Sequence, residues 1–224
     1  MFSLNVISKE ENKSKNAIAD LKGYGLSITN KPDIVLCLGD FGTLFRAENK
    51  FPAIPKVLIK DQEICKNEED EKFKKIIEKI IEKKYKINEY PKLEADNLVG
   101  MNDIIIRNRD PGTALKFTVK IDNRYIIREL IGDGIVIATP FGATGYFNSI
   151  TRKKFSKGFG IAFNNPIKRA KPVYAGTEST ISLAVNDGIA LVCADNCKDI
   201  IELSSGKSIS IKRNDKNAKI IALK

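Results

Sequence analysis

The chain contains no histidine and no tryptophan. Without histidine, neither a Ser-His-Asp triad nor a Cys-His pair can form, because both use an imidazole as the proton acceptor. Long apolar runs are also missing, since no segment approaches the roughly 20 apolar residues that span a bilayer. The N-terminus carries its charges after a short apolar piece, which is the reverse of a secretory signal. We therefore expect a cytoplasmic protein without a membrane partner.

Cysteine is scarce, and its spacing does not suggest a metal site. Cys193 and Cys197 are four residues apart, but there is no second close pair and no histidine to complete a zinc site. Cys37 lies inside an apolar run and is predicted to be a small core residue. Cys65 completes the set of four. We expect no metal held by side chains of the chain alone.

Positive charge is in excess, because 38 lysines and arginines oppose 28 acids and leave a net charge of +10. One reading is a phosphate-rich partner, such as a nucleotide, a dinucleotide or nucleic acid; the other is a lysine- and isoleucine-rich proteome. No basic run is expected to be interleaved with exposed aromatic residues, so a nucleic-acid surface is not specifically indicated.

Residues 1–95 alternate strand and helix signals, which predicts a three-layer α/β nucleotide-binding domain. The longest helical signal places isoleucines three and four residues apart, with lysine and glutamate on the opposite face. The expected strands are Leu4–Ile7, Ile34–Leu38 and Lys56–Ile59, and the expected helices are Lys13–Lys22 and Glu69–Lys84.

Residues 96–224 contain successive strand signals without a long helix, which predicts a β-sandwich domain. Turn dipeptides such as Asp122-Asn123 and Ser205-Gly206 separate the strands. Any C-terminal return onto the first domain would be short. The expected strands are Asp103–Ile106, Leu115–Ile121, Tyr125–Glu129, Ile135–Ala138, Thr180–Val185, Ile189–Cys193, Ile200–Leu203 and Ser208–Ile211.

The segment Gly132–Tyr146, GDGIVIATPFGATGY, has the most informative pattern. A β-branched apolar run ends at Thr139-Pro140 and continues into a loop of small residues. A glycine-rich loop after a buried strand lets backbone N–H groups approach a ligand closely, because no Cβ intervenes. The alternative for Asp133-Gly134 is an ordinary hairpin turn, since Asp-Gly is a favoured type I′ pair.

Two further motifs carry polar groups at strand ends. Asp40 in VLCLGDFGT follows a buried strand, where a carboxylate can accept a hydroxyl proton or hold Mg²⁺, or can simply cap the next helix. Asn102-Asp103 precedes an apolar strand, where an amide and a carboxylate suit ribose hydroxyls, or form a polar turn.

Taken in chain order, the three motifs resemble those of the NAD kinase family, and the resemblance extends from Ile34 to about Leu203. The family's GGDGT and LRA sequences are similar to LGDFGTLFRA at Leu38–Ala47, and its Asn-Glu motif is similar to Asn102-Asp103. Its DG-x-x-x-(A/S)TPTGSTAY signature is matched from Asp133 to Tyr146, with a serine three residues later. The implied fold is an α/β nucleotide-binding domain followed by a β-sandwich.

The resemblance implies transfer of the terminal phosphate of ATP, or of polyphosphate, to the 2′-hydroxyl of the adenosine ribose of NAD. Asp40 would act on that hydroxyl, as a base or a charge partner. Magnesium would accompany the donor. The implied binding residues are Gly39, Gly42 and Thr43 for the triphosphate, Asn102, Asp103 and Asp133 for the dinucleotide, and Thr144, Gly145, Tyr146 and Ser149 for the adenosine pocket.

The chain departs from the family pattern at several positions. Phe41 replaces a glycine or is inserted between GD and GT, and the register of GTLFRA favours insertion. Asp103 stands where glutamate is usual, and Phe141 where a hydroxyl is usual. A Lys- and Arg-rich segment, Ile150–Lys157, replaces the family's GGPI sequence. The family's Asn-Gly loop is not recognisable around Leu58–Cys65.

Two other functions remain open at this point. Diacylglycerol kinases and phosphofructokinases share a GGDGT-type loop, so a lipid or sugar kinase is one alternative. A non-catalytic NAD(P)-binding sensor is the other, because the glycine loop is altered. The resemblance also implies a homodimer or homotetramer formed through the β-domain.

Overall fold

The computed structural model describes residues 3–60, 69–195 and 197–224. The chain forms two compact units, Met1–Glu89 with Asn217–Lys224, and Tyr90–Lys216. Cys65 and most of the segment Leu58–Cys65 lie outside the described residues. Among the described helices, none is long and apolar enough to cross a lipid bilayer.

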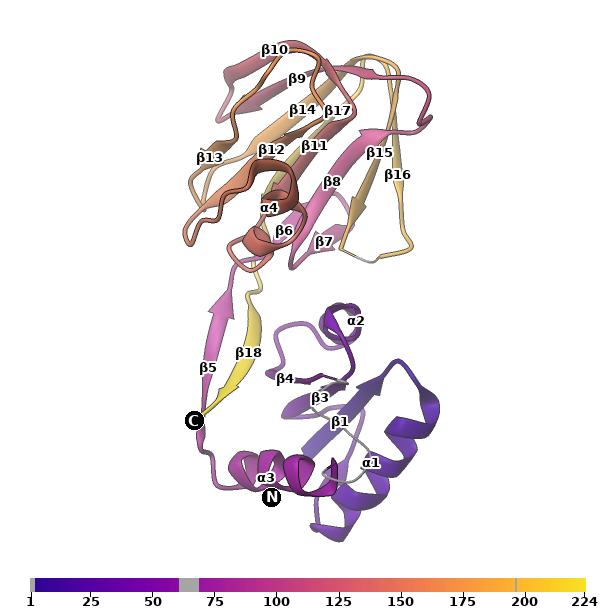
Figure 1. The fold of residues 1–224 in the computed structure, drawn as a ribbon, viewed down its shortest axis with the longest axis vertical. Coiled ribbons are helices and arrows are strands. Elements are labelled where there is room, and N and C mark those ends of the chain that lie inside the picture. Colours follow the sequence, from indigo (N-terminus) through magenta and orange to yellow (C-terminus); the bar gives the residue numbers. More distant parts are fainter. Residues whose placement is uncertain (1–2, 61–68, 196) are drawn as a thin grey trace. The chain divides into compact units, whose positions relative to one another are not determined.

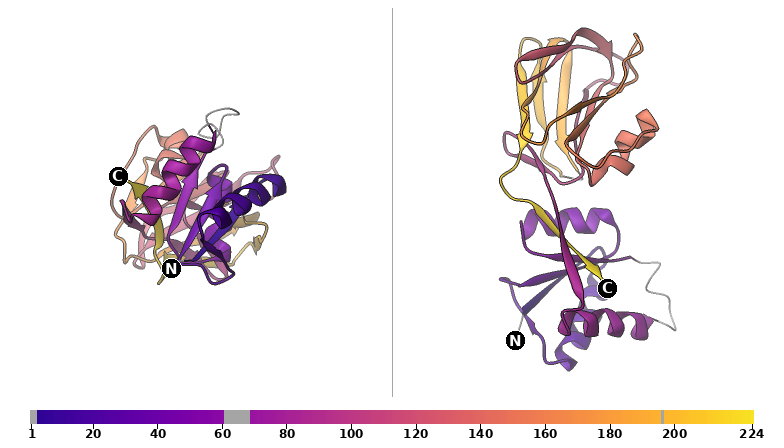
Figure 2. Two further views of the ribbon diagram at one scale, coloured as in Figure 1. Left: turned by 90° about the horizontal axis from the view of Figure 1, so that it is seen from below. Right: turned by 90° about the vertical axis from the view of Figure 1, so that its left-hand side faces the viewer.

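The first unit is a three-layer α/β domain (Figure 1). Its six-stranded sheet has the order β2-β1-β3-β4-β18-β5. Helices α1 and α3 cover one face of this sheet and α2 covers the other (Figures 1 and 2). The elements are β1 (Ser3–Ser8), α1 (Glu11–Gly23), β2 (Ser27–Ile28), β3 (Ile34–Leu38), α2 (Phe41–Lys50), β4 (Lys56–Ile59), α3 (Glu69–Ile81), β5 (Tyr85–Tyr90) and β18 (Ala218–Leu223).

Strand β3 explains why its sequence is a continuous apolar run. All five of its residues are buried. Leu36 and Leu38 belong to the core beneath α1 and α3, and the alternate residues Val35 and Cys37 point to the opposite face. Burial raises the pKa of the Cys37 thiol to about 12. Helices on both faces therefore leave no polar position in the strand.

The second unit is a sandwich of two six-stranded sheets, ordered β10-β9-β14-β17-β6-β7 and β13-β12-β11-β8-β15-β16. Figure 1 shows the short helix α4 outside the second sheet. The elements are β6 (Leu93–Ala95), β7 (Leu98–Gly100), β8 (Asp103–Asn108), β9 (Leu115–Ile121), β10 (Arg124–Gly132), β11 (Gly134–Ala138), the 3₁₀ turn η2 (Gly142–Thr144), α4 (Tyr146–Thr151), β12 (Phe159–Asn164), β13 (Val173–Ala175), β14 (Ile181–Asp187), β15 (Ile189–Ala194), β16 (Ile201–Ser204) and β17 (Ser208–Arg213).

Strand β11 is buried on both faces, like β3. Ile135 and Ile137 join the core between the sheets, whereas Val136 and Ala138 form a smaller apolar cluster with Phe147 of α4. The sandwich fixes the strand from one side and α4 covers it from the other. This arrangement brings the glycine-rich loop directly over the end of β11.

The predicted fold class, an α/β domain followed by a β-sandwich, is confirmed. The two units have slightly different bounds from the predicted domains, residues 1–95 and 96–224. Tyr90 already belongs to the second unit, and residues 217–224 return to the first. Strand β18 pairs in parallel with β4, because its apolar side chains complete the core beneath α3. Nothing in its local sequence specified which sheet it would join.

Two local predictions also need correction. The six-residue helix α4 was not expected, because no side chain caps its N-terminus and it is too short for a periodic pattern. Asp133-Gly134 is not a hairpin turn, since β10 and β11 lie in different sheets. Gly134 has φ +129°, and a Cβ there would lie 2.0 Å from the carbonyl oxygen of Ile106. Only glycine allows the chain to cross between the sheets at this point.

A buried ion pair joins α2 to β4. The Lys56 Nζ lies 2.6 Å from Glu48 Oε2, and both side chains are almost completely inaccessible. The same ammonium donates to the carbonyl oxygens of Phe51 and Ile54, each at 2.7 Å. A buried charge is tolerated when every donor finds a partner. This ammonium therefore fixes the turn between α2 and β4.

Replacing Lys56 with methionine should destabilise the protein by about 3–5 kcal/mol, because it removes the cation that Glu48 contacts inside the protein. Urea unfolding measures the loss. The matched control is Lys84→Met, which breaks the exposed pair with Glu82 and should cost less than about 1 kcal/mol. Equal losses for the two variants would contradict this prediction.

Candidate functional site

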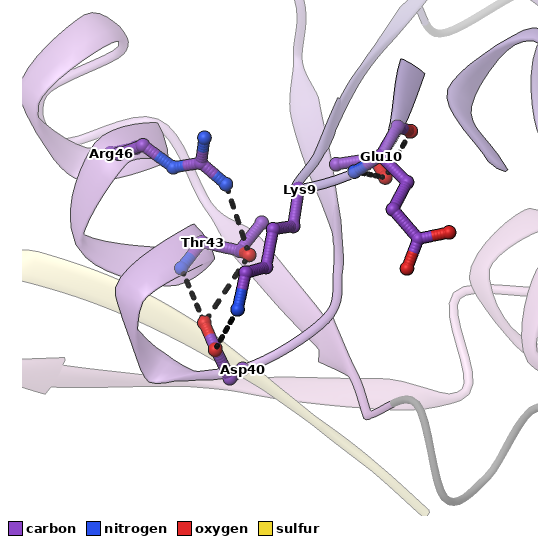
Figure 3. A network of polar contacts seen from close by, with 6 residues as sticks. Lys9, Glu10, Asp40, Thr43 and Arg46 are labelled. Atoms are coloured by element: carbon purple, nitrogen blue, oxygen red, sulfur yellow. Dashed lines mark hydrogen bonds and ion pairs between the residues drawn. The ribbon is translucent and has the colours of Figure 1, made fainter. Parts of the chain in front are cut away.

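Asp40 caps the N-terminus of α2 directly after β3 (Figure 3). Its Oδ1 accepts the backbone N–H of Thr43 at 3.0 Å and the Thr43 hydroxyl at 3.4 Å. The Arg46 guanidinium donates to the same hydroxyl at 3.3 Å. One carboxylate oxygen is thus used to hold the helix, as the capping interpretation predicted.

The second oxygen of Asp40 faces outward. Oδ2 lies 3.7 Å from the Lys9 Nζ, and the Asp40 side chain is 59% exposed. The Thr43 N–H and, more weakly, the Lys9 ammonium hold the pKa of Asp40 below its ordinary value. The carboxylate is therefore ionised at neutral pH, with one oxygen bound to the helix and the other accessible.

The neighbouring glycine and threonine shape this loop. Gly39 has φ +142°, and a Cβ there would approach the Thr43 hydroxyl to 2.7 Å. Thr43 is completely buried, so its side chain supports Asp40 and is not open to a ligand. Gly42 lies in the first turn of α2 and is half-buried. Phe41, the first helical residue, is 48% exposed and stacks on Phe45.

In the second unit, Asp195 holds the turn that contains Asn102 and Asp103. Its carboxylate accepts three backbone N–H groups, from Met101 at 2.7 Å, Asn102 at 2.8 Å and Asp103 at 3.1 Å. In return, the Asp195 N–H donates to the carbonyl oxygen of Asp103 at 3.1 Å. A single half-buried side chain thereby fixes three consecutive residues.

Asp103 is buried beside this carboxylate. Burial, and then the charge of Asp195, raise its pKa to about 7, although a hydrogen bond from Asn102 opposes the shift. In that bond the Asn102 Nδ2 donates to Asp103 Oδ2 at 2.8 Å. The pKa of Asp195 is also raised, chiefly by burial. Asp103 therefore changes its protonation near neutral pH.

The glycine-rich loop packs directly on the Asn102 turn. The Thr139 hydroxyl donates to the carbonyl oxygen of Met101 at 2.7 Å, and the Thr139 N–H donates to that of Asn102 at 3.0 Å. The Gly142 N–H donates to the Thr139 hydroxyl at 3.2 Å. A Cβ on Gly142 would lie 2.0 Å from the Asn102 carbonyl oxygen. Two motifs about forty residues apart in sequence are thus brought together, and glycine is required where they touch.

Tyr146 links this cluster to the far end of β11. Its phenolic oxygen accepts the amide of Asn164 at 3.1 Å, and Asn164 pairs with Gly134 across the sheet. Asp133, next in the chain, accepts from the amide of Asn165 at 3.3 Å. The predicted residues of this unit are therefore spread along β11, with Asp103 at one end and Asp133 at the other.

The remaining predicted residues differ in their exposure. Thr144 and Gly145 are exposed. The Ser149 hydroxyl donates to the carbonyl oxygen of Tyr146 within α4 at 2.7 Å. The expectation that all three line an adenosine pocket stays a prediction.

Two residues that hold this site together, Asp195 and Asn164, were not predicted from the sequence. Asp195 had a usable signal, because it directly follows the apolar strand Ile189–Ala194, much as Asp40 follows β3 after one glycine. Asn164 had none, since its role depends on the register between β11 and β12.

Comparisons with known proteins identify the family. A family model described as the ATP-NAD kinase C-terminal domain matches residues 101–223, more than half of the chain. An NAD kinase of Sulfurisphaera tokodaii is 38% identical over 154 residues, which are 65% of this chain and 61% of that protein. The chain thus spans less than two thirds of the length of this curated relative.

Two solved structures share the fold. An NAD kinase from Archaeoglobus fulgidus, in complex with ATP, has a TM-score of 0.79 and 19% identity, covering 99% of this chain and 94% of its own. A yeast NADH kinase complexed with NADH has a TM-score of 0.83 and 15% identity, covering 100% of this chain and 84% of its own. From the match to the family model over residues 101–223, we conclude that the chain belongs to the NAD kinase family.

Proposed function

We propose that this protein transfers the terminal phosphate of ATP to the 2′-hydroxyl of the adenosine ribose of NAD, producing NADP. The observation that carries the proposal is the Asp40 carboxylate, which is ionised, exposed and positioned by the N-terminus of α2. It occupies the aspartate position of the family's GGDGT motif. Membership of the NAD kinase family and the ATP-bound relative support the same reaction.

Asp40 would orient and polarise the ribose hydroxyl and accept its proton as the phosphate transfers. Its lowered pKa makes it a weak base but a permanent negative charge. Phosphoryl transfer mainly requires positioning and charge neutralisation, which suits such a group. The backbone N–H groups at the start of α2, including that of Gly42, would favour phosphate oxygens.

The Asn102 turn would bind hydroxyls or the adenine of NAD. The Asn102 amide and the Asp103 carboxyl offer donors and acceptors side by side. Because the pKa of Asp103 is about 7, its carboxyl can donate in the protonated form and accept in the ionised form. Tyr146 and Thr144, on the adjoining loop, would contact the adenosine.

Magnesium fits this chain only as a companion of the donor. Among the described residues, no group of three or more acidic or cysteine side chains could hold a metal ion. Mg²⁺ commonly binds through one or two carboxylates together with substrate phosphates. Asp40 is the exposed carboxylate that would contribute to such binding, and the ion would neutralise phosphate charge.

Replacing Asp40 with asparagine should lower the rate of NADP formation by at least about a hundredfold, since it removes the charge and the proton acceptor. Asparagine remains a good N-cap, so α2 should stay folded. The assay follows NADP from NAD, ATP and Mg²⁺. Asp20→Asn, an exposed change of the same type on α1, is the control and should keep the wild-type rate.

A near-normal rate in Asp40→Asn would contradict the proposed role of this residue. If the folded wild-type protein binds NAD but forms no NADP with ATP or polyphosphate, the kinase proposal fails and a non-catalytic dinucleotide-binding protein remains.

Asp103 should make the protein less stable as the pH rises. Its pKa of about 7 lies above the ordinary value of 3.8, so between about pH 4 and pH 7 the folded state retains a proton that the unfolded chain releases. Linkage then lowers the free energy of unfolding with rising pH, by up to about 4 kcal/mol. Asp195, with its raised pKa, contributes in the same direction.

Asp103→Asn removes one of these titrations. Urea unfolding at about pH 5 and about pH 8 should show a smaller loss of stability in the variant than in the wild type. An equal loss in both proteins would mean that Asp103 does not titrate in this range.

Asp195→Asn should weaken NAD binding without a direct contact to it, because the Asn102 turn loses acceptors for its N–H groups. We expect the KM for NAD to rise by about tenfold and hydrogen exchange at residues 101–103 to accelerate. Asp187→Asn, at the exposed last residue of β14, is the matched control. Unchanged exchange at residues 101–103 would rule out this role for Asp195.

A further inference from the structure

The positive charge of the chain is concentrated in one stretch of the second unit. Residues 134–177 contain no aspartate or glutamate, but they contain seven basic residues. The net charge of the whole chain is +10, so most of it originates here. The seven residues are Arg152, Lys153, Lys154, Lys157, Lys168, Arg169 and Lys171.

Three of these side chains line a groove of about 600 Å³ beside α4. Its walls are the C-terminal end of α4 and the segment between β12 and β13, so it lies entirely within the second unit. None of the lining residues carries a carboxylate, although the lining residue Asn165 donates a hydrogen bond to Asp133 at 3.3 Å. We call this feature the basic groove, defined by Lys153, Arg169, Lys171, Thr151, Asn165 and Phe163.

The cations of the basic groove have no acidic partners among the residues that the structure describes. In the described part of the chain, none of the seven basic residues forms an ion pair, whereas Lys212 pairs with Glu94 and Arg109 with Glu202 on the same unit. Like charges gathered without counter-charges repel one another, so their proximity costs free energy. An anionic ligand would remove that cost.

The backbone that carries Lys153 is held firmly. Arg152 adopts the left-handed conformation, with φ +57°, where α4 ends. The Lys153 N–H donates to the Thr151 hydroxyl at 3.1 Å, and its carbonyl oxygen accepts the Asn148 amide at 3.0 Å. Lys153 therefore extends from a fixed turn and lines the same groove as Arg169 and Lys171.

The groove suits phosphates without bases attached. Arginine binds phosphate with two parallel hydrogen bonds and lysine as a point charge, so the groove offers both. Nucleic-acid grooves also need exposed aromatic faces on which bases stack. Phe163, the aromatic residue among those that line the groove, is only 4% exposed.

We propose that the basic groove binds a linear chain of phosphates, as in inorganic polyphosphate or the triphosphate of a nucleotide. This binding is separate from the phosphorylation of NAD and does not depend on it. The groove volume falls within the range of small-ligand sites.

Isothermal titration with inorganic tripolyphosphate tests the proposal. The variant Lys153→Glu/Arg169→Glu/Lys171→Glu should raise the dissociation constant by at least about tenfold and reduce its salt dependence. The control Lys198→Glu/Lys207→Glu/Lys216→Glu changes the net charge equally at exposed positions outside the groove, and should change the constant by less than about twofold.

A milder variant, with glutamine at the same three groove positions, guards against unfolding, and circular dichroism checks the fold of each protein.

Loss of tripolyphosphate binding with unchanged ATP binding supports inorganic polyphosphate as the ligand. Loss of both supports a nucleotide triphosphate. Equal weakening by groove and control variants overturns the proposal, as does groove-dependent binding of a single-stranded oligonucleotide that is tighter than that of polyphosphate. Because no turnover is measured, failure to form NADP would not affect the result.

Discussion

The Asp195 carboxylate is the interaction on which the candidate site of the second unit depends. It binds three consecutive backbone N–H groups and so determines the path of the Asn102 turn. Thr139 and Gly142 contact that turn, so the position of the glycine-rich loop depends on the same carboxylate. Next to it lies a buried acid, Asp103, whose pKa rises to about 7, chiefly through burial and further through the charge of Asp195. The carboxylate that makes the turn rigid thus also adds to its sensitivity to protons.

The Asp40 side chain can cap a helix and act chemically at the same time. The sequence left open whether it caps a helix or acts chemically, and the geometry allows both, since the two carboxylate oxygens have different partners. Capping also orients the group, because the oxygen bound to Thr43 fixes the direction of the other. Thr43, expected to meet a ligand, is instead buried as the support for this carboxylate.

Much of the fold could be predicted because both β3 and β11 are apolar along their whole length, which requires cover on both faces. The motifs around Asp40, Asn102 and Gly142 could be predicted as chemically meaningful because glycines and polar residues follow or precede such strands. Pairing between distant segments could not be predicted. The Tyr146–Asn164 contact depends on the β11–β12 register, and the position of β18 depends on a free place beside β4. Neither leaves a local pattern.

The place of β18 has a consequence for biosynthesis. Strands β5 and β18 are neighbours in the first sheet, yet the entire second unit lies between them in the chain. During translation the first sheet stays incomplete until the sandwich has been synthesised. Its missing strand position exposes unpaired backbone groups beside β4 for that interval. Strand β18, which is synthesised after the sandwich, therefore completes a domain whose other strands precede the sandwich in the chain, and the nascent protein depends until then on how well that open edge is protected.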